Sequence, residues 1–253
     1  MNSISKWVSV FVLCAVSSLP VNAWAVDSKG TVLITGANRG IGLALAQHFG
    51  DAGFEVIGTA RNPDRAAELK ESGAQLVQLD VTDQASVDAM AKSLAGQPID
   101  ILINNAGVKG KDSKDMASLD VDNIEWILNV NTLGPVRVMK ALFPNVQSGQ
   151  RKTIVNISST MGSIERNTWG CCAGYRASKT ALNSINKTFA VDLGEQGVTF
   201  VVMHPGYVQT DMNDGSGNIS TDQSAAGLMN VITSLDVSDN GKFYDWQGKE
   251  LPW

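Results

Sequence analysis

The sequence predicts one α/β domain, built as a doubly wound parallel sheet with helices on both faces. Short apolar runs alternate with longer segments of helical periodicity, which is typical of parallel strands joined by helical crossovers. A glycine-rich turn from Gly36 to Gly42 separates the first apolar run from the first helical segment. Polar residues follow the ends of several apolar runs, at the sheet edge where this kind of fold binds ligands. Together these features predict a dinucleotide-binding (Rossmann) domain.

The first 25 residues are expected to be a cleaved signal peptide, which leaves residues 26–253 as the folded domain. Lys6 is the only charged side chain in this segment, and Trp7 to Leu19 forms an apolar run. Ala23-Trp24-Ala25 has the small-x-small form of a cleavage site. The run is too short for a comfortable membrane span. An exported protein is therefore expected; the alternatives are an uncleaved anchor, or a cytoplasmic protein with a wrongly assigned start.

Composition excludes some functions. The 253 residues carry a formal net charge of −5 and no basic run, which argues against nucleic acid as a partner. No His/Cys cluster has metal-ligand spacing, so no metal is expected. Cys171 and Cys172 are neighbours, and their Cα atoms should be about 3.8 Å apart, below the usual disulfide range of roughly 4.4–6.8 Å. We therefore expect reduced or partner-linked thiols.

The expected elements follow the apolar pattern. Strands are predicted at Thr31–Ile34, Glu55–Ala60, Gln75–Leu79, Asp100–Ile103, Thr153–Ile157 and Val198–Met203, with a short last strand at Phe243 and Tyr244. Helices are predicted from the glycine turn to Ala52, and at Asp64–Ser72, Asp83–Leu94, Ile124–Phe143 and Tyr175 to about Gly194. Pro135 is expected to bend the fourth of these helices.

The glycine-rich turn predicts a phosphate site. Glycines let the backbone approach a pyrophosphate, and the following helix N-terminus offers free N–H groups. The spacing is Gly-x3-Gly-x-Gly, and a purely structural turn is the alternative reading. The second strand ends at Ala60 and not at an acid, while Arg61 and Arg39 can both bind a 2′-phosphate. We therefore expect NADP(H) in preference to NAD(H), unless both arginines are simply solvated.

Tyr175 and Lys179 are four residues apart, so a helix places them on one face. A phenol ordinarily titrates near pH ~10, and an adjacent ammonium favours the phenolate and lowers its pKa. A lowered pKa suits proton transfer to or from a carbonyl oxygen near neutrality. Such a pair also occurs by chance on solvated helices, and the agreement with the other motifs is what favours the catalytic reading.

These motifs together resemble the short-chain dehydrogenase/reductase family over essentially the whole mature chain. The matching residues are Thr35-Gly36-x3-Gly40-x-Gly42, Asn104-Asn105-Ala106-Gly107, Asn131, Ser159, Tyr175-x3-Lys179 and Pro205-Gly206-x3-Thr210. The Gly-Thr-Ala-Arg-Asn-Pro run ending at Pro63, the stretch His204 to Met212 and the tail Gly241 to Trp253 are most similar to C-factor-like and sniffer-like carbonyl reductases.

The resemblance implies residue roles. Tyr175 would be the general acid in reduction, Lys179 would lower its pKa and bind the nicotinamide ribose, Ser159 would bind the substrate carbonyl, and Asn131 would hold a relay water. The cofactor would contact Gly36, Asn38, Arg39, Gly40, Ile41, Gly42, Arg61, Asp80, Val81, Asn105, Ala106, Gly107, Tyr175, Lys179, Pro205, Gly206, Val208 and Thr210.

The resemblance thus implies an NADPH-dependent reductase of a small or medium aldehyde or ketone. The alternative is a nucleotide-binding signalling or interaction protein of the same fold with little turnover. Ser159 and Tyr175 are 16 positions apart, more than the commonest family spacing, and the extra loop should shape the substrate mouth. The family also implies a possible homodimer or homotetramer through the long helices. Identity of the substrate is not encoded in any readable motif.

Overall fold

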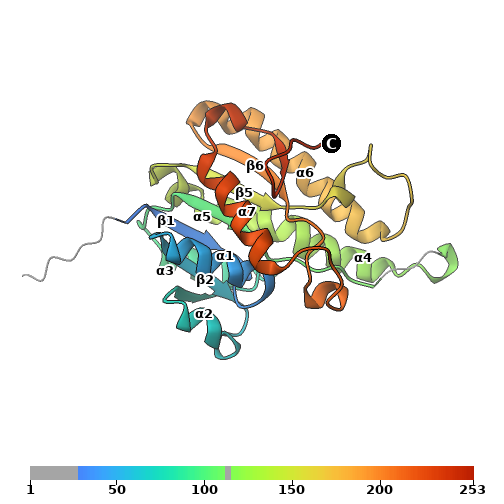
Figure 1. Cartoon of the computed structure of the whole chain (residues 1–253), viewed down its shortest axis with the longest axis horizontal. Coiled ribbons are helices and arrows are strands. Elements are labelled where there is room, and N and C mark those ends of the chain that lie inside the picture. Colours follow the sequence, from blue (N-terminus) through green and yellow to red (C-terminus); the bar gives the residue numbers. More distant parts are fainter. Residues whose placement is uncertain (1–27, 112–114) are drawn as a thin grey trace, which may run out of the picture.

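The computed structural model describes residues 28–111 and 115–253, so the expected signal peptide lies outside the described residues. Seven parallel strands form one sheet in the order β3-β2-β1-β4-β5-β6-β7 (Figure 1). Their bounds are β1 Thr31–Ile34, β2 Glu55–Ala60, β3 Gln75–Gln78, β4 Ile101–Asn104, β5 Thr153–Ile157, β6 Thr199–His204 and β7 Phe243–Asp245. The predicted doubly wound fold is confirmed, with strand ends within a residue or two of those expected.

The strand order reverses between β1 and β4, which pair directly with Val32 opposite Ile101. β1, β4 and β5 are buried along their whole length, which explains why they are continuous apolar runs and not alternating ones. In an open parallel sheet, the crevice for a ligand opens outside the carboxyl ends of the strands at such a reversal. The fold therefore locates the expected site next to the β1 and β4 ends.

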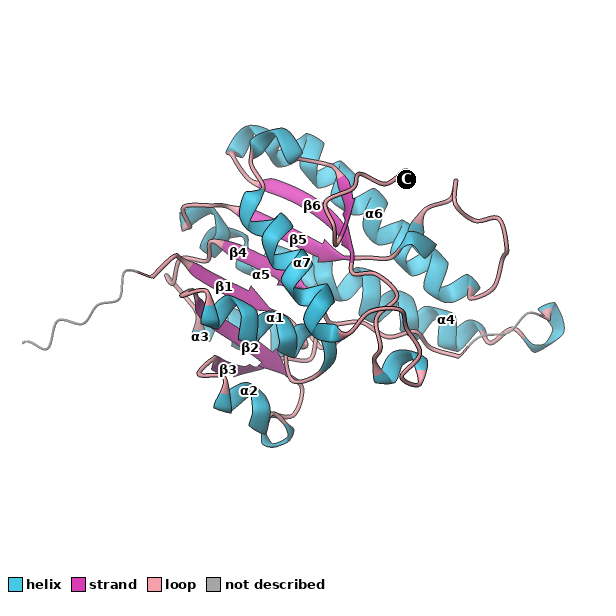
Figure 2. Ribbon diagram, in the orientation of Figure 1, coloured by secondary structure: helices cyan, strands magenta, loops and turns pink. Residues whose placement is uncertain are grey.

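Helices cover both faces of the sheet (Figure 2). They are α1 Gly40–Asp51, α2 Ala67–Glu71, α3 Gln84–Ser93, α4 Val121–Leu128, α5 Gly134–Ser148, α6 Ala173–Leu193 and α7 Thr221–Ser234. Apolar side chains of α1, α2 and α7 form the core on one face, and those of α3, α5 and α6 form it on the other. In the described part of the chain, no helix is long and apolar enough to cross a membrane.

Three helices differ from the sequence prediction. The helix expected at Ile124–Phe143 is divided into α4 and α5 by one turn of π-helix at Asn129–Leu133. The segment Asp64–Ser72 forms a short 3-10 turn and then α2. The sequence reasoning missed α7 altogether, although Ser220 and Gln223 form a capping box at its start.

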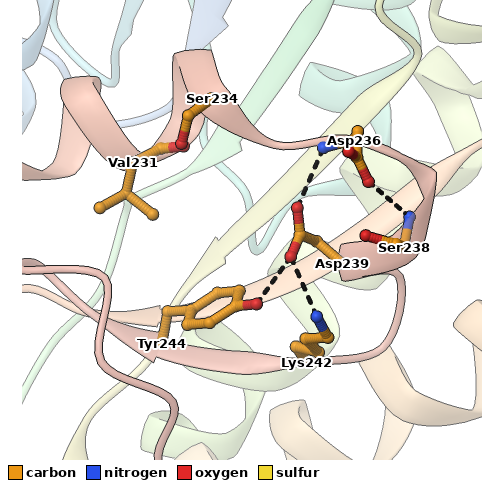
Figure 3. Close-up of polar contacts among 7 residues, drawn as sticks. All are labelled: Val231, Ser234, Asp236, Ser238, Asp239, Lys242 and Tyr244. Atoms are coloured by element: carbon orange, nitrogen blue, oxygen red, sulfur yellow. Dashed lines mark hydrogen bonds and ion pairs between the residues drawn. The ribbon is translucent and has the colours of Figure 1, made fainter.

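A polar cluster fixes the last strand against the segment that follows α7 (Figure 3). The Tyr244 hydroxyl donates to Asp239 Oδ1 at 2.6 Å, and Lys242 Nζ lies 3.2 Å from the same oxygen. The Asp236 amide donates to Asp239 Oδ2 at 3.0 Å. Partial burial alone would raise the pKa of the Asp239 carboxyl, but these donors outweigh burial and hold it below its usual range. The cluster therefore fixes β7 to the turn at Val237–Asp239 that precedes it.

Candidate active site

The glycine-rich turn after β1 has the backbone that its sequence demands. Gly36 and Gly40 adopt left-handed φ values of 65° and 58°. Gly42, in the first turn of α1, has no room for a side chain: a Cβ there would meet the Gly36 carbonyl oxygen and would lie 2.5 Å from Asn105 Nδ2. Gly42 therefore lets the turn pack closely against Asn105 and lead directly into α1, and this backbone cradle at a helix N-terminus is the kind of place where a pyrophosphate binds.

Two threonines hold this cradle in place: Thr35, which begins the glycine motif but was given no role, and Thr59, which the sequence did not single out. The Thr35 hydroxyl accepts from the backbone amides of Asn105 and Ala106, both at 3.0 Å. The Asn105 amide Nδ2 donates in return to the Thr35 carbonyl at 3.0 Å. Thr59 of β2 accepts from the Gly36 amide at 3.3 Å. Thr35 and Thr59 thus join the turn to the neighbouring strands, and a buried Thr at a strand end is the signal that could have revealed them.

Arg61 follows β2 and Asp80 follows β3, at the carboxyl edge of the sheet. Thr82 donates to Asp80 Oδ1 from its backbone at 2.9 Å and from its hydroxyl at 2.6 Å. Burial alone would raise the pKa of the Asp80 carboxyl, but the Thr82 bonds and the nearby Arg61 cation outweigh it, so the pKa lies below its usual value. Asp80 is therefore ionised and oriented at neutral pH.

Arg39 is not free in the structure. Its Nη1 lies 3.0 Å from Asp211 Oδ2, and the two side chains are 71% and 81% exposed. Asp211 directly follows Thr210 in the loop after β6, and Thr210 Cγ2 lies 3.8 Å from where a Cβ at Gly40 would sit. The ion pair therefore joins the glycine turn to the loop expected to contact the nicotinamide. Exposed pairs of this type contribute little, about 0–1 kcal/mol.

The loop after β6 is fixed by a helix that the sequence prediction lacked. The hydroxyl of Ser224, in α7, donates to the Pro205 carbonyl at 2.6 Å and is fully buried. Gly206 has a left-handed φ of 92°, which favours glycine there. Thr210 begins a capped turn with Asn213. Ser224 is thus a supporting residue that could have been found only by recognising α7.

The remaining predicted cofactor residues lie along the same edge. Asn38 is in the glycine turn and Ile41 in the first turn of α1; Val81 follows Asp80 beyond β3; Ala106 and Gly107 follow β4; and Val208 lies in the loop after β6. The sheet topology thus brings every predicted cofactor residue to the carboxyl edge.

Ser159 and Tyr175 lie next to each other beyond the carboxyl end of β5. Ser159 lies two residues beyond the end of β5, and Tyr175 is the third residue of α6. The Ser159 hydroxyl accepts from the Met161 amide at 3.1 Å and lies close enough to the Tyr175 phenol to lower its pKa. The neighbouring Ser158 hydroxyl instead donates to Asn183 Oδ1 at 2.7 Å. The Ser158 hydroxyl is thus used inside the fold, and Ser159 is the serine next to Tyr175.

The pKa of Tyr175, which lies one helical turn before Lys179, is raised and not lowered. Lys179 Nζ donates to the Ile157 carbonyl at 2.9 Å and lies 5.8 Å from the centroid of the Tyr175 ring. Burial raises the pKa of the Tyr175 phenol to about 12, and the Ser159 hydroxyl opposes this increase. Burial also lowers the pKa of Lys179 to about 8. The expected lowering of the Tyr175 pKa is therefore not seen, because desolvation exceeds any effect of the ammonium.

Asn131 lies in the π-helical turn between α4 and α5, an irregularity that often marks functional positions. Its Oδ1 accepts from the Val108 amide at 2.8 Å, and its Nδ2 donates to the Val108 carbonyl at 2.8 Å. A Cβ at Gly107 would lie 3.3 Å from Asn131 Oδ1 and 3.6 Å from Lys179 Nζ. Gly107 therefore leaves open the space between these two polar groups.

The expectation for the cysteines was wrong. Cys171 and Cys172 form a disulfide although their Cα atoms are only 3.8 Å apart. Both residues adopt left-handed backbone, with φ values of 64° and 59°. Sequence reasoning considered only the Cα spacing, whereas this rare backbone conformation permits the pairing. The disulfide lies in the predicted substrate-mouth loop, immediately before α6.

Comparison with known proteins agrees with this geometry. The short chain dehydrogenase family model matches residues 30–219. C-signal of Myxococcus xanthus is 37% identical over 165 residues, which are 65% of this chain and 99% of that protein. NADPH-bound carbonyl reductase from chicken fatty liver has a TM-score of 0.82 at 32% identity, covering 89% of this chain and 100% of that chain. Carbonyl reductase Sniffer of D. melanogaster has a TM-score of 0.83 at 30% identity, covering 88% and 99%.

The chain therefore belongs to the short-chain dehydrogenase family, and the family predicted from its motifs is confirmed. Its similarity to C-signal and to the Sniffer structure also supports the predicted subgroup. Membership makes it an oxidoreductase of this family.

Proposed function

We propose that this protein is an NADPH-preferring carbonyl reductase that acts on a small or medium, largely apolar aldehyde or ketone. The observation that carries the proposal is that Ser159, Tyr175 and Lys179 lie together: the Ser159 hydroxyl is close enough to lower the pKa of the phenol, and Lys179 Nζ lies 5.8 Å from the centroid of the phenol ring. Binding a nucleotide does not require a phenol beside a hydroxyl at this place. Reducing a carbonyl requires a proton donor there, because the new alkoxide must receive a proton.

In this proposal, NADPH would supply the hydride, and the chain supplies position and protons. Ser159 would donate to the substrate carbonyl oxygen, and Tyr175 would transfer its proton to that oxygen. Lys179 would place positive charge near the developing alkoxide, and Asn131 would hold the relay toward solvent. The cradle formed by Gly36, Gly40 and Gly42 fits the cofactor pyrophosphate, with Arg39 and Arg61 for the 2′-phosphate.

The test is the Tyr175→Phe variant. This change removes one proton donor and no phosphate contact, so kcat for the best aldehyde of a panel should fall by at least about 100-fold. The Kd for NADPH, measured by fluorescence titration, should stay within about twofold. A variant that retains a large share of the wild-type kcat would refute the role of Tyr175.

The similarity to C-signal supports a second candidate, a nucleotide-binding signalling protein with little turnover. Mature protein mixed with NADPH and a panel of aldehydes and quinones separates the two functions. Cofactor consumption that depends on Tyr175 supports the reductase. Tight NADPH binding without consumption supports the signalling protein.

A further inference from the structure

Arg176 directly follows Tyr175 in α6 and is only 7% exposed. In the described part of the chain, no carboxylate forms an ion pair with it. Backbone carbonyl oxygens hold the guanidinium instead: Nε donates to Gly170 and Cys171, both at 3.0 Å, and Nη1 donates to Met161 at 3.3 Å. A buried cation is unfavourable unless its donors are used in this way, and of the Arg176 nitrogens only Nη2 has no hydrogen-bond partner in the described part of the chain.

The groups that Arg176 binds come from both sides of the candidate active site. Met161 is two residues beyond Ser159, in the 3-10 turn Thr160–Gly162. Gly170 and Cys171 lie in the loop that leads into α6. One planar side chain therefore ties the segment after Ser159 to the segment before Tyr175, using the fork of donors that only arginine has.

The Trp169 ring covers the same guanidinium. Arg176 Cζ lies 4.7 Å from the ring centroid, within the range of a cation–π contact. The indole is 65% exposed and so forms the solvent side of this arrangement.

The segment that enters α6 has an unusual backbone. Gly170, Cys171 and Cys172 adopt left-handed φ values of 71°, 64° and 59° in succession. Sterics disfavour this conformation for each non-glycine residue by roughly five- to thirty-fold. Cys172 is also the N-cap of α6 and gives it no side-chain cap. The disulfide and the Arg176 bonds are among the contacts that hold this entry in place, together with the bond from the Gly170 amide to Asn167 Oδ1 at 3.2 Å.

We propose that Arg176 is a positioning residue that holds Tyr175 against Ser159, and that the Cys171–Cys172 disulfide keeps the left-handed turn in the shape that the guanidinium binds. The proposal rests on the proposed reductase function. Arg176 itself need not touch substrate or cofactor. Its effect is geometric, because a displacement of about 1 Å between reacting groups can lower a rate by about 100-fold.

The first arm of the experiment uses Arg176→Lys and Arg176→Met. Lysine keeps the charge but loses the fork, so both variants should lower kcat by roughly 10- to 100-fold. NADPH affinity should stay within about twofold, since no phosphate contact changes. Arg151→Met is the matched control: Arg151 also donates to a backbone carbonyl, that of Thr233 at 3.1 Å, and lies over Phe54, but at the amino end of β5. The control should leave kcat unchanged.

The second arm reduces the disulfide with dithiothreitol. Two electrons break the S–S bond, each sulfur takes a proton to become a thiol, and the reductant closes to its own cyclic disulfide. Alkylation and peptide mapping should find both thiols blocked before reduction and free after it. Reduction should lower kcat several-fold in wild type but change Arg176→Met little further, because both act on one turn. The Cys171→Ser/Cys172→Ser double variant should match reduced wild type.

Two readouts distinguish positioning from a general structural loss. In the folded protein the Ser159 hydroxyl lowers the pKa of the Tyr175 phenol. If Arg176→Lys moves the two groups apart, this pKa should rise, and the pH midpoint of alcohol oxidation should move to higher pH. Hydrogen exchange should rise for amides between residues 160 and 176 and stay unchanged in the sheet. If Arg176→Met does not fold, Arg176→Lys and reduced wild type decide the question.

Tyr175→Phe is measured in parallel. If it retains activity, the proposed function fails and the inference falls with it. If Tyr175→Phe is inactive while Arg176→Lys and the disulfide-free protein keep kcat within about twofold, only the positioning role is overturned. Free thiols in unreduced protein would likewise overturn the part assigned to the disulfide.

Discussion

Lys179→Met should make the protein more stable at neutral pH while abolishing reduction. Lys179 is 5% exposed, and burial lowers its pKa from 10.5 to about 8. At about 1.4 kcal/mol per pH unit, this difference corresponds to about 3 kcal/mol by which the fold disfavours the ammonium. Methionine removes that penalty but also the bond to the Ile157 carbonyl, which contributes about 1 kcal/mol. The free energy of unfolding should therefore rise by about 2 kcal/mol.

The stability difference between Lys179→Met and wild type should decrease as the pH rises. Between about 8 and 10.5 the unfolded chain binds a proton at Lys179 that the folded chain lacks, so wild-type stability rises with pH there. Below this range both states are protonated and the full penalty applies. Because Lys179→Met has no such group, its stability advantage should shrink by about 2 kcal/mol between about pH 7 and about pH 10.

The assay is chemical unfolding of both proteins by urea across this pH range, followed by circular dichroism. Taking the difference between variant and wild type removes the contribution of every other titrating group. Lys187→Met is the control, because Lys187 is exposed on the same helix and also donates to a carbonyl, that of Gly241 at 3.2 Å. A difference that stays constant with pH, or a Lys179→Met protein less stable than wild type by more than about 1 kcal/mol at pH 7, would refute the reasoning.

Three further predictions concern the cofactor site and the amino terminus. NADPH should bind roughly tenfold more tightly than NADH, less at high salt, and Arg61→Asp should reverse the preference; tighter NADH binding by wild type at low salt would contradict the assignment. Gly42→Ala should weaken NADPH binding by at least about 100-fold, because its Cβ would meet Asn105 Nδ2; an unchanged Kd would show that the cradle is not the pyrophosphate site. Amino-terminal sequencing of protein from the native host should find Val26, whereas Met1 would indicate a cytoplasmic enzyme.

The sequence predicted the sheet, and the site residues at its carboxyl edge, because both depend on short-range patterns along the chain. Glycine spacing determines where the chain can turn at left-handed φ, and the four-residue interval of Tyr175 and Lys179 determines a shared helix face. The apolar runs determined the strands in the same way. Each of these patterns can be recognised from residues that are close to one another in the sequence.

Two features that the sequence did not predict depend on burial and on backbone torsions, which apolar patterns and residue spacing do not report. The pKa of Tyr175 follows from burial, which no local pattern reports. The Cys171–Cys172 bond depends on two backbone torsions set by the loop. α7 is a different case, because the capping box of Ser220 and Gln223 is a local signal that could have predicted it. Its apolar pattern is weak, so the helix that fixes the loop after β6 was not predicted.

Burial also connects stability to function at Tyr175. Two buried cations lie beside it on α6, Arg176 next to it and Lys179 one turn further on. Neither has a carboxylate partner in the described part of the chain, and carbonyl oxygens hold both. Carbonyl dipoles orient a cation but do not cancel its charge, so positive potential remains in a region of low dielectric. Negative charge that develops on a substrate oxygen is stabilised most strongly in such a place. The charge that destabilises the fold at Lys179 is thus the charge that reduction would use, which is why one substitution should raise stability and remove activity.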